Sequence, residues 1–92
     1  MIATKTKFNL GRTVITPNAL DQLTLAGVQA ALDRHAAGDW GSVDPEDWRA
    51  NDRALEDGTR LLSAYPSERC KKFWIITEAD RSVTTILMPE DY

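Results

Sequence analysis

The strongest pattern in the chain is a pair of apolar runs near its C-terminal end, residues 73–76 and 83–87, joined by a polar loop. Both runs are rich in β-branched and aromatic residues, which favour strands, so residues 72–88 are expected to form a β-hairpin. Successive side chains of a strand point to opposite faces, and both faces of this hairpin are apolar. Helices should cover one face, and a helix, another chain segment or a partner molecule should cover the other.

Two helices are predicted in the first half of the chain. Thr16, followed by proline, is expected to start a short helix over residues 18–23, because a threonine hydroxyl caps the first turn and proline fits the first helical position. Thr24 starts a second helix, in which apolar residues recur at intervals of three and four. This helix should end at Gly38, since glycine commonly terminates helices in the left-handed conformation.

A third helix and two further strand candidates complete the pattern. Asp44, again followed by proline, is expected to cap a helix over residues 45–56, whose apolar stripe is narrow and which should otherwise face water. Residues 8–15 predict a strand or short hairpin, and residues 59–65 predict a strand that extends the C-terminal hairpin into a meander. The rest of the chain is expected to pack on or around the C-terminal hairpin.

The fold class that follows is α+β, as one domain over residues 1–92. We expect an antiparallel three- to five-stranded sheet with a C-terminal meander and two or three helices on one face. A chain of this length buries enough surface to fold without a metal or a disulfide. The single cysteine, Cys70, agrees with a reducing compartment, and no secretion signal or membrane-spanning run is present, so a cytoplasmic location and no membrane partner are expected.

The net charge of −3 is unevenly distributed. Residues 32–57 contain eight acids and three bases, a local charge of −5, whereas the flanking segments are neutral or positive. This segment could meet a basic protein surface, although a solvated helical face explains it equally well. The chain lacks the basic stripe of a nucleic-acid-binding protein.

Residue types that carry chemistry are sparse. His35 is the only histidine, and its place on the apolar face of a helix is typical of a packed residue. One histidine and one cysteine cannot form a closed metal site. Four acids could supply a carboxylate pair for acid–base catalysis but are expected to be solvated: Glu78, Asp80, Glu90 and Asp91. We therefore expect no enzyme activity, no catalytic residues, no metal and no cofactor.

The tryptophans are the better functional signal, because aromatic residues dominate interface energies. Trp74 is expected in the core. Trp40 lies in a loop between two glycines, as a loop anchor or a contact residue, and Trp48 lies near a helix start. With the neighbouring acids these two form the candidate protein-binding site, which comprises Asp39, Trp40, Asp44, Asp47 and Trp48.

Several segments together carry a resemblance to a known family: LGRTVITPNAL, RHAAGDWG, NDRALEDGTRLLSAY and KFWIITEADRSVTTILMPEDY. The chain resembles a family of small, uncharacterised plasmid-related proteins of bacterial mobile elements, over nearly its whole length. The family has no established activity, so the resemblance implies a setting and no catalytic residues. Accessory proteins in that setting include inhibitors of host defence.

The hypothesis that follows is a non-enzymatic protein-binding accessory protein of a bacterial mobile element, with an anti-CRISPR-like inhibitor of host defence as its most specific form. Its partner would be a host or mobile-element protein. A homodimer through the sheet is another explanation of the second apolar face. The alternative function is a nucleic-acid-directed regulator or a RelE/ParE-like ribonuclease toxin, which would use Arg69, Lys71, Lys72 and Arg81. The acidic balance of the chain disfavours that alternative.

Overall fold

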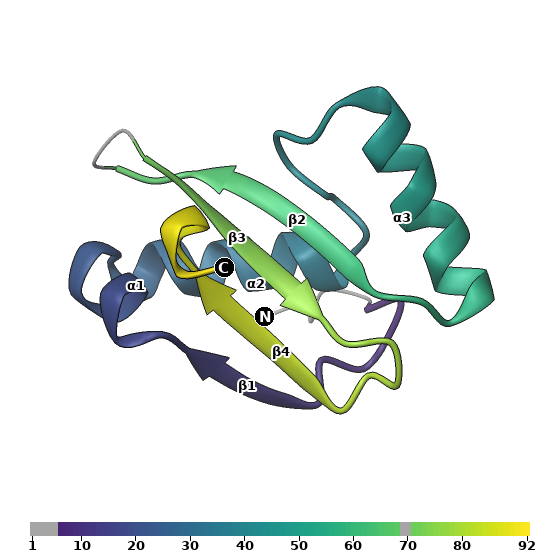
Figure 1. Ribbon diagram of the computed structural model, residues 1–92, viewed down its shortest axis with the longest axis horizontal. Helices are drawn as coiled ribbons and strands as arrows, with labels where there is room; N and C mark the ends of the chain where they lie inside the picture. The colour runs from purple at the N-terminus through teal and green to yellow at the C-terminus, as the bar shows by residue number, and fades with distance from the viewer. Residues whose placement is uncertain (1–5, 69–70) are drawn as a thin grey trace, which may run out of the picture.

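The chain folds around one four-stranded sheet, and the computed structural model describes residues 6–68 and 71–92. The strands lie side by side in the order β1-β4-β3-β2 (Figure 1). They are β1 (Arg12–Ile15), β2 (Leu61–Pro66), β3 (Lys72–Thr77) and β4 (Val83–Leu87). The predicted hairpin is confirmed, because β3 and β4 pair antiparallel with Ile75 opposite Ile86. β2 pairs antiparallel with β3, which completes the predicted meander and confirms the α+β class.

β1 is shorter than expected and pairs parallel to its neighbour. The strand predicted over residues 8–15 begins only at Arg12, after Gly11, whose backbone is left-handed at φ 66°. A Cβ atom on Gly11 would collide with the carbonyl oxygens of Arg81 and Ser82, so this close approach requires glycine. β1 then runs parallel to β4, and the chain between these two strands passes through the three α-helices and the other two strands. The sheet is therefore mixed, with one parallel edge strand.

The three helices begin and end close to the predicted signals. They are α1 (Pro17–Gln22), α2 (Leu25–Ala36) and α3 (Pro45–Asp57). The hydroxyls of Thr16 and Thr24 cap the first two helices by accepting a hydrogen bond from a backbone N–H in the first turn. Asp44 caps α3 in the same way, and Gly58 ends it in the left-handed conformation at φ 72°. These local signals are sufficient to set the helix boundaries to within one or two residues.

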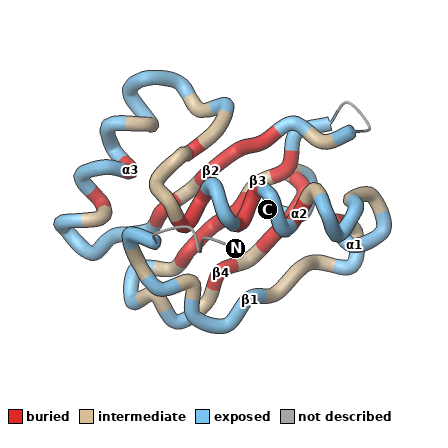
Figure 2. Tube along the Cα trace, turned by 180° about the vertical axis from the view of Figure 1, so that it is seen from behind, coloured by how far each residue is buried: buried red, intermediate tan, exposed pale blue. Residues whose placement is uncertain are grey.

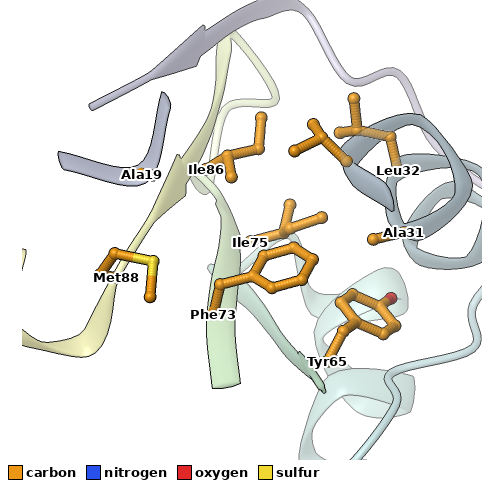
Figure 3. Close-up of a cluster of buried hydrophobic side chains, with 9 residues drawn as sticks. Ala19, Ala31, Leu32, Tyr65, Phe73, Ile75, Ile86 and Met88 are labelled. Carbon is orange, nitrogen blue, oxygen red and sulfur yellow. The ribbon is translucent and has the colours of Figure 1, made fainter. Parts of the chain in front are cut away.

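The main core lies between α2 and one face of the sheet (Figures 1 and 3). Phe73 and Ile75 of β3 and Ile86 of β4 are buried against Ala31 and Leu32 of α2 (Figure 3). Figure 2 shows that the buried positions follow the central strands, whereas much of α3 is exposed. Truncating one such large side chain to alanine typically costs about 2–5 kcal/mol. This face of the sheet therefore serves stability.

α3 lies along the outer edge of β2 (Figure 1). The Asn51 side chain donates to the Leu62 carbonyl at 2.7 Å and accepts from the Leu62 N–H at 3.1 Å. Next to it, Ser42 N donates to the Ala64 carbonyl at 2.7 Å, and Ala64 N donates to the Trp40 carbonyl at 3.2 Å. The backbone groups on this edge are thus bonded within the chain, which protects the edge from pairing with another strand.

The opposite face of the sheet, here called the second face, is only partly covered. Ile76 and Leu87 are almost completely buried there, whereas Trp74 is half-buried. The cover comes from the end of the chain, where the short 3₁₀ helix η1 (Pro89–Asp91) and then Tyr92 lie over β3 (Figure 1). The chain thus supplies part of the predicted cover from its own tail and leaves part of the second face open.

Candidate functional site

An open groove of about 520 Å³ lies on the second face, between strands β2 and β3 and the segment that leads into α3. We call it the sheet-face groove. Its lining comes from that segment, from the first turn of α3, from both strands and from the tail, and consists of Ser42, Val43, Asp44, Asp47, Leu62, Ala64, Lys72, Trp74 and Pro89. A concave surface with apolar and charged parts is the usual form of a binding site, so this groove is the candidate functional site.

Strand alternation sets the floor of the sheet-face groove. Leu62 and Ala64 of β2 share a face with Trp74 of β3, because Ala64 pairs with Trp74 and Leu62 pairs with Ile76. Trp74 and Leu62 are half-buried, so part of each apolar side chain reaches solvent. The Tyr92 ring stands edge-on to the Trp74 ring, with centroids 5.8 Å apart and an angle of 68° between the planes. This contact packs the indole against the tail.

Two carboxylates form one wall of the sheet-face groove. Asp44 Oδ1 accepts a hydrogen bond from Asp47 N at 2.8 Å, and both side chains are exposed. A backbone bridge between Gly41 and Ala64 joins the segment that carries them to β2. Gly41 has φ 76°, and a Cβ atom there would collide with the Ala64 carbonyl oxygen, so only glycine allows this approach. The two acids are thus held beside the floor.

Of the five residues predicted as a protein-binding site, only Asp44 and Asp47 line the sheet-face groove. Trp40 has an exposed fraction of 0% and packs in a cluster with Ala54 of α3. Its indole Nε1 donates to an Asp52 carboxylate oxygen at 3.0 Å. Trp40 therefore anchors the loop, which is one of the two roles expected for it, and its buried side chain offers no surface to a partner, unlike the other expected role of a contact residue.

Asp39 and Trp48 also lie outside the lining of the groove. Asp39 accepts two hydrogen bonds from the Arg34 guanidinium, at 2.8 and 3.3 Å, and the Arg34 hydrogen bond lowers the pKa of the Asp39 carboxyl. Trp48 is half-buried against the cluster that contains Trp40. The predicted site grouped residues that are close in sequence, and the fold directs them to different environments.

The floor of the groove is the part that sequence reasoning missed. Trp74 was expected in the core, but it is half-buried and lines the groove. Leu62 and Val43 were not singled out at all. The available signal is the alternation in β2 and β3, which places Leu62 on the face that carries Trp74. No local pattern indicates that the segment containing Val43 returns to β2.

His35 lies at the centre of a buried polar chain and away from the groove. The Thr84 hydroxyl donates to the Leu10 carbonyl at 2.6 Å, so it must accept from the Thr77 hydroxyl at 2.7 Å. Thr77 in turn accepts from His35 Nε2 at 2.9 Å, and Nδ1 accepts from the Ser63 hydroxyl. Burial lowers the pKa of His35 from 6.5 to about 4, so the imidazole is neutral near pH 7. Because His35 is fully buried, its role is structural.

Arg81, one of the residues named for the alternative function, is used within the fold. Its backbone is left-handed at φ 61°, and its guanidinium donates to the Ala54 carbonyl near the end of α3 at 2.9 Å. The lysines at 71–72 are exposed at the start of β3. Arg69 and Cys70 lie outside the described residues. Of the described members of the basic set, Lys71 and Lys72 are therefore exposed, whereas Arg81 is half-buried and bonded within the fold.

Among residues 6–68 and 71–92, no group of three histidine, cysteine or acidic side chains is placed to hold a metal ion. In the same part of the chain, no helix combines the length and the apolar character needed to cross a membrane. In comparisons with known proteins, the chain matches no protein-family model, no curated protein and no solved structure.

Proposed function

We propose that the chain is a non-enzymatic protein-binding module and that the sheet-face groove is its docking surface. The observation that carries this proposal is the combination of a half-buried apolar floor, formed by Trp74 and Leu62, with the exposed acids Asp44 and Asp47 in the same lining. In protein interfaces, central aromatic residues contribute much of the binding energy, and polar residues surround them. The groove combines an aromatic residue, Trp74, with the polar residues Asp44 and Asp47.

The partner would also cover the surfaces around the groove. A specific complex typically buries about 800 Å² on each protein, which is roughly one-seventh of the 5812 Å² accessible surface of this chain. The exposed side of α3 and Tyr92, which is 71% exposed and contacts Trp74, are the neighbouring surfaces. An interface centred on the groove would therefore extend over α3 and the tail.

The setting we propose comes from the resemblance to plasmid-related proteins of bacterial mobile elements. The chain would act in the cytoplasm on a host or mobile-element protein, and its most specific form would be an anti-CRISPR-like inhibitor of host defence. It would act by occupying a surface of the target. The local charge of −5 in residues 32–57, which includes both groove carboxylates, supports a target with a basic surface.

A pair of matched substitutions tests the docking surface. Leu62→Lys places a charge on the groove floor, whereas Leu25→Lys makes the same exchange at a position 77% exposed at the start of α2. We expect wild type and Leu25→Lys to capture one stoichiometric protein partner from host lysate, and Leu62→Lys to lose it. Far-UV circular dichroism would confirm that both variants fold. Equal capture by the two variants, or no stoichiometric partner for wild type, would contradict the proposal.

A second copy of the chain is another occupant that the apolar floor could accept. Light scattering over a range of concentrations distinguishes it, because a dimer has twice the 10.3 kDa mass of one chain. If the sheet-face groove forms the dimer interface, Leu62→Lys should restore a single chain per particle and Leu25→Lys should not. One chain per particle for wild type at all concentrations would exclude this occupant.

A further inference from the structure

The sheet-face groove contains the groups that recognise an arginine side chain, and we propose that the partner inserts one there. This inference rests on the docking role proposed above. A guanidinium is a planar cation with five N–H donors, which stacks on aromatic rings and pairs with carboxylates through two parallel hydrogen bonds. Trp74, Asp44 and Asp47 all line the groove, so an aromatic ring and two carboxylates border the same open space.

The two carboxylates retain acceptor capacity for such a cation. Asp44 uses Oδ1 to cap α3, which leaves Oδ2 for a ligand. Asp47 contributes its backbone N–H to that cap, and its side chain is exposed. The two ion pairs found among residues 6–68 and 71–92 both lie elsewhere and involve neither acid. Neither Arg34 nor Arg60, the cations of those two ion pairs, is therefore paired with the carboxylates on the wall of the groove.

The Trp74 indole is held in place before any partner arrives. Its ring contacts the Tyr92 ring at a centroid distance of 5.8 Å, and Arg60 Nη1 donates to the Tyr92 hydroxyl at 3.0 Å. Arg60 also pairs with Glu78 at 3.3 Å, which connects the tail to the end of β3. A cation that stacks on an aromatic ring already fixed by packing loses less free energy to ordering.

The charge of the lining favours one arginine over a run of basic residues. Among the described residues of the lining, Lys72 is the only basic one, and with Asp44 and Asp47 their formal charges sum to −1. A single cation balances this charge, and further cations would be repelled by Lys72. A lysine side chain would supply the charge but lacks the planar fork that can stack and bond two acceptors at once.

Peptide titrations followed by ¹H–¹⁵N NMR test the inference with three probes. These are an acetylated and amidated peptide GLRLG, its lysine counterpart GLKLG, and the same peptide with citrulline, the neutral isostere, in place of arginine. We expect the arginine peptide to shift the Trp74 indole N–H and the Asp44 and Asp47 amides. It should bind on the order of tenfold more tightly than the citrulline peptide, with the lysine peptide between them. Equal binding of the arginine and citrulline peptides, or no shift at these positions, would overturn the inference.

Two double variants separate arginine recognition from docking in general. Asp44→Asn with Asp47→Asn removes both groove charges but keeps the cap of α3, since asparagine caps helices as well as aspartate does. Glu46→Gln with Glu56→Gln makes the same charge change at exposed positions of α3 outside the lining. The first pair should weaken binding of the arginine peptide on the order of tenfold, and the second should leave it unchanged. If both pairs bind equally well, the inference fails, whereas loss of the partner with Leu62→Lys would still support docking.

Discussion

Acid should destabilise the chain through His35. Burial lowers the pKa of its imidazole to about 4, whereas in the unfolded chain the group has its ordinary value of 6.5. Between these values the unfolded state binds a proton that the native state does not, so the free energy of unfolding falls as pH falls from 6.5 towards 4. At about 1.4 kcal/mol per pKa unit, the loss is about 2 kcal/mol at pH 5 and about 3 kcal/mol at pH 4.

Urea unfolding followed by circular dichroism at several values between about pH 7.5 and pH 5 measures this loss. His35→Gln is the control variant, because glutamine does not titrate and keeps a donor and an acceptor near Ser63 and Thr77. Only the change with pH is compared, so the intrinsic stability of the variant cancels. Wild type should lose about 2 kcal/mol more than the variant over this range.

Carboxylates contribute to acid sensitivity in a lower pH range. The pKa of Asp39 is lowered by its hydrogen bond from Arg34, and the pKa of Asp91 is lowered by its hydrogen bond from Thr16. The stability that these groups contribute is lost only as pH falls towards their own lowered values. The difference between wild type and His35→Gln above pH ~5 therefore isolates the histidine. Identical pH dependence of the two proteins would refute the buried, neutral imidazole.

Substitutions at three positions of the groove frame, two of them with a control substitution, are tested by urea unfolding. Gly41→Ala should lower the free energy of unfolding by about 3 kcal/mol or more, because left-handed strain adds to a collision with the Ala64 carbonyl. Gly58→Ala carries the strain without a collision and should lower it by about 1 kcal/mol. Equal losses would contradict the close approach of Gly41 to β2. Asn51→Ala should cost about 2 kcal/mol, since two hydrogen bonds to the edge of β2 are lost, and an unchanged midpoint would argue against that role. Asp44→Ala should cost about 1 kcal/mol and Asp44→Asn almost nothing; equal losses would rule out the cap.

The elements of the fold could be predicted because their signals act over a few residues. The caps at Thr16, Thr24 and Asp44 each bond a backbone N–H in the next turn of the chain. The hairpin over residues 72–88 joins two strands through one short loop. Its alternation also predicted correctly that apolar side chains occur on both faces. Such interactions involve only residues close in sequence, so the local sequence pattern is enough to predict them.

The groove could not be predicted, because it depends on contacts between segments far apart in the chain. The bridge from Gly41 to Ala64 brings the acids beside the strands, and no repeat or motif specifies that pairing. Trp40, which precedes Gly41, is buried against Ala54 of α3. In the sequence, by contrast, Trp40 lies between glycines and acids, which is typical of an exposed loop residue. The parallel pairing of β1 with β4, which sets Arg12 opposite Val83, is equally remote from local pattern.

The extent to which the second face is covered also could not be predicted from local sequence pattern. Alternation predicts that Trp74 and Ile76 share an apolar face, but the extent of cover depends on where the tail goes. Tyr92 packs on Trp74 and is held through Arg60, so the tail covers part of this face. The tail and the segment before α3 both contribute to the lining, through Pro89 and Asp44 among others. The open part of the face is the space that they leave.

The most direct test of the account is a map of the interface on the complex with the captured partner. Cross-saturation NMR from unlabelled partner to ²H,¹⁵N-labelled chain would report which amides lie at the contact. The docking proposal predicts that intensity is lost at the amides of residues 42–44, of Asp47, and of Leu62 and Trp74. It predicts unchanged intensity at Leu25, which is exposed at the start of α2. Losses confined to α1 and α2, with none at the groove, would contradict the claim that the second face of the sheet is where the partner binds.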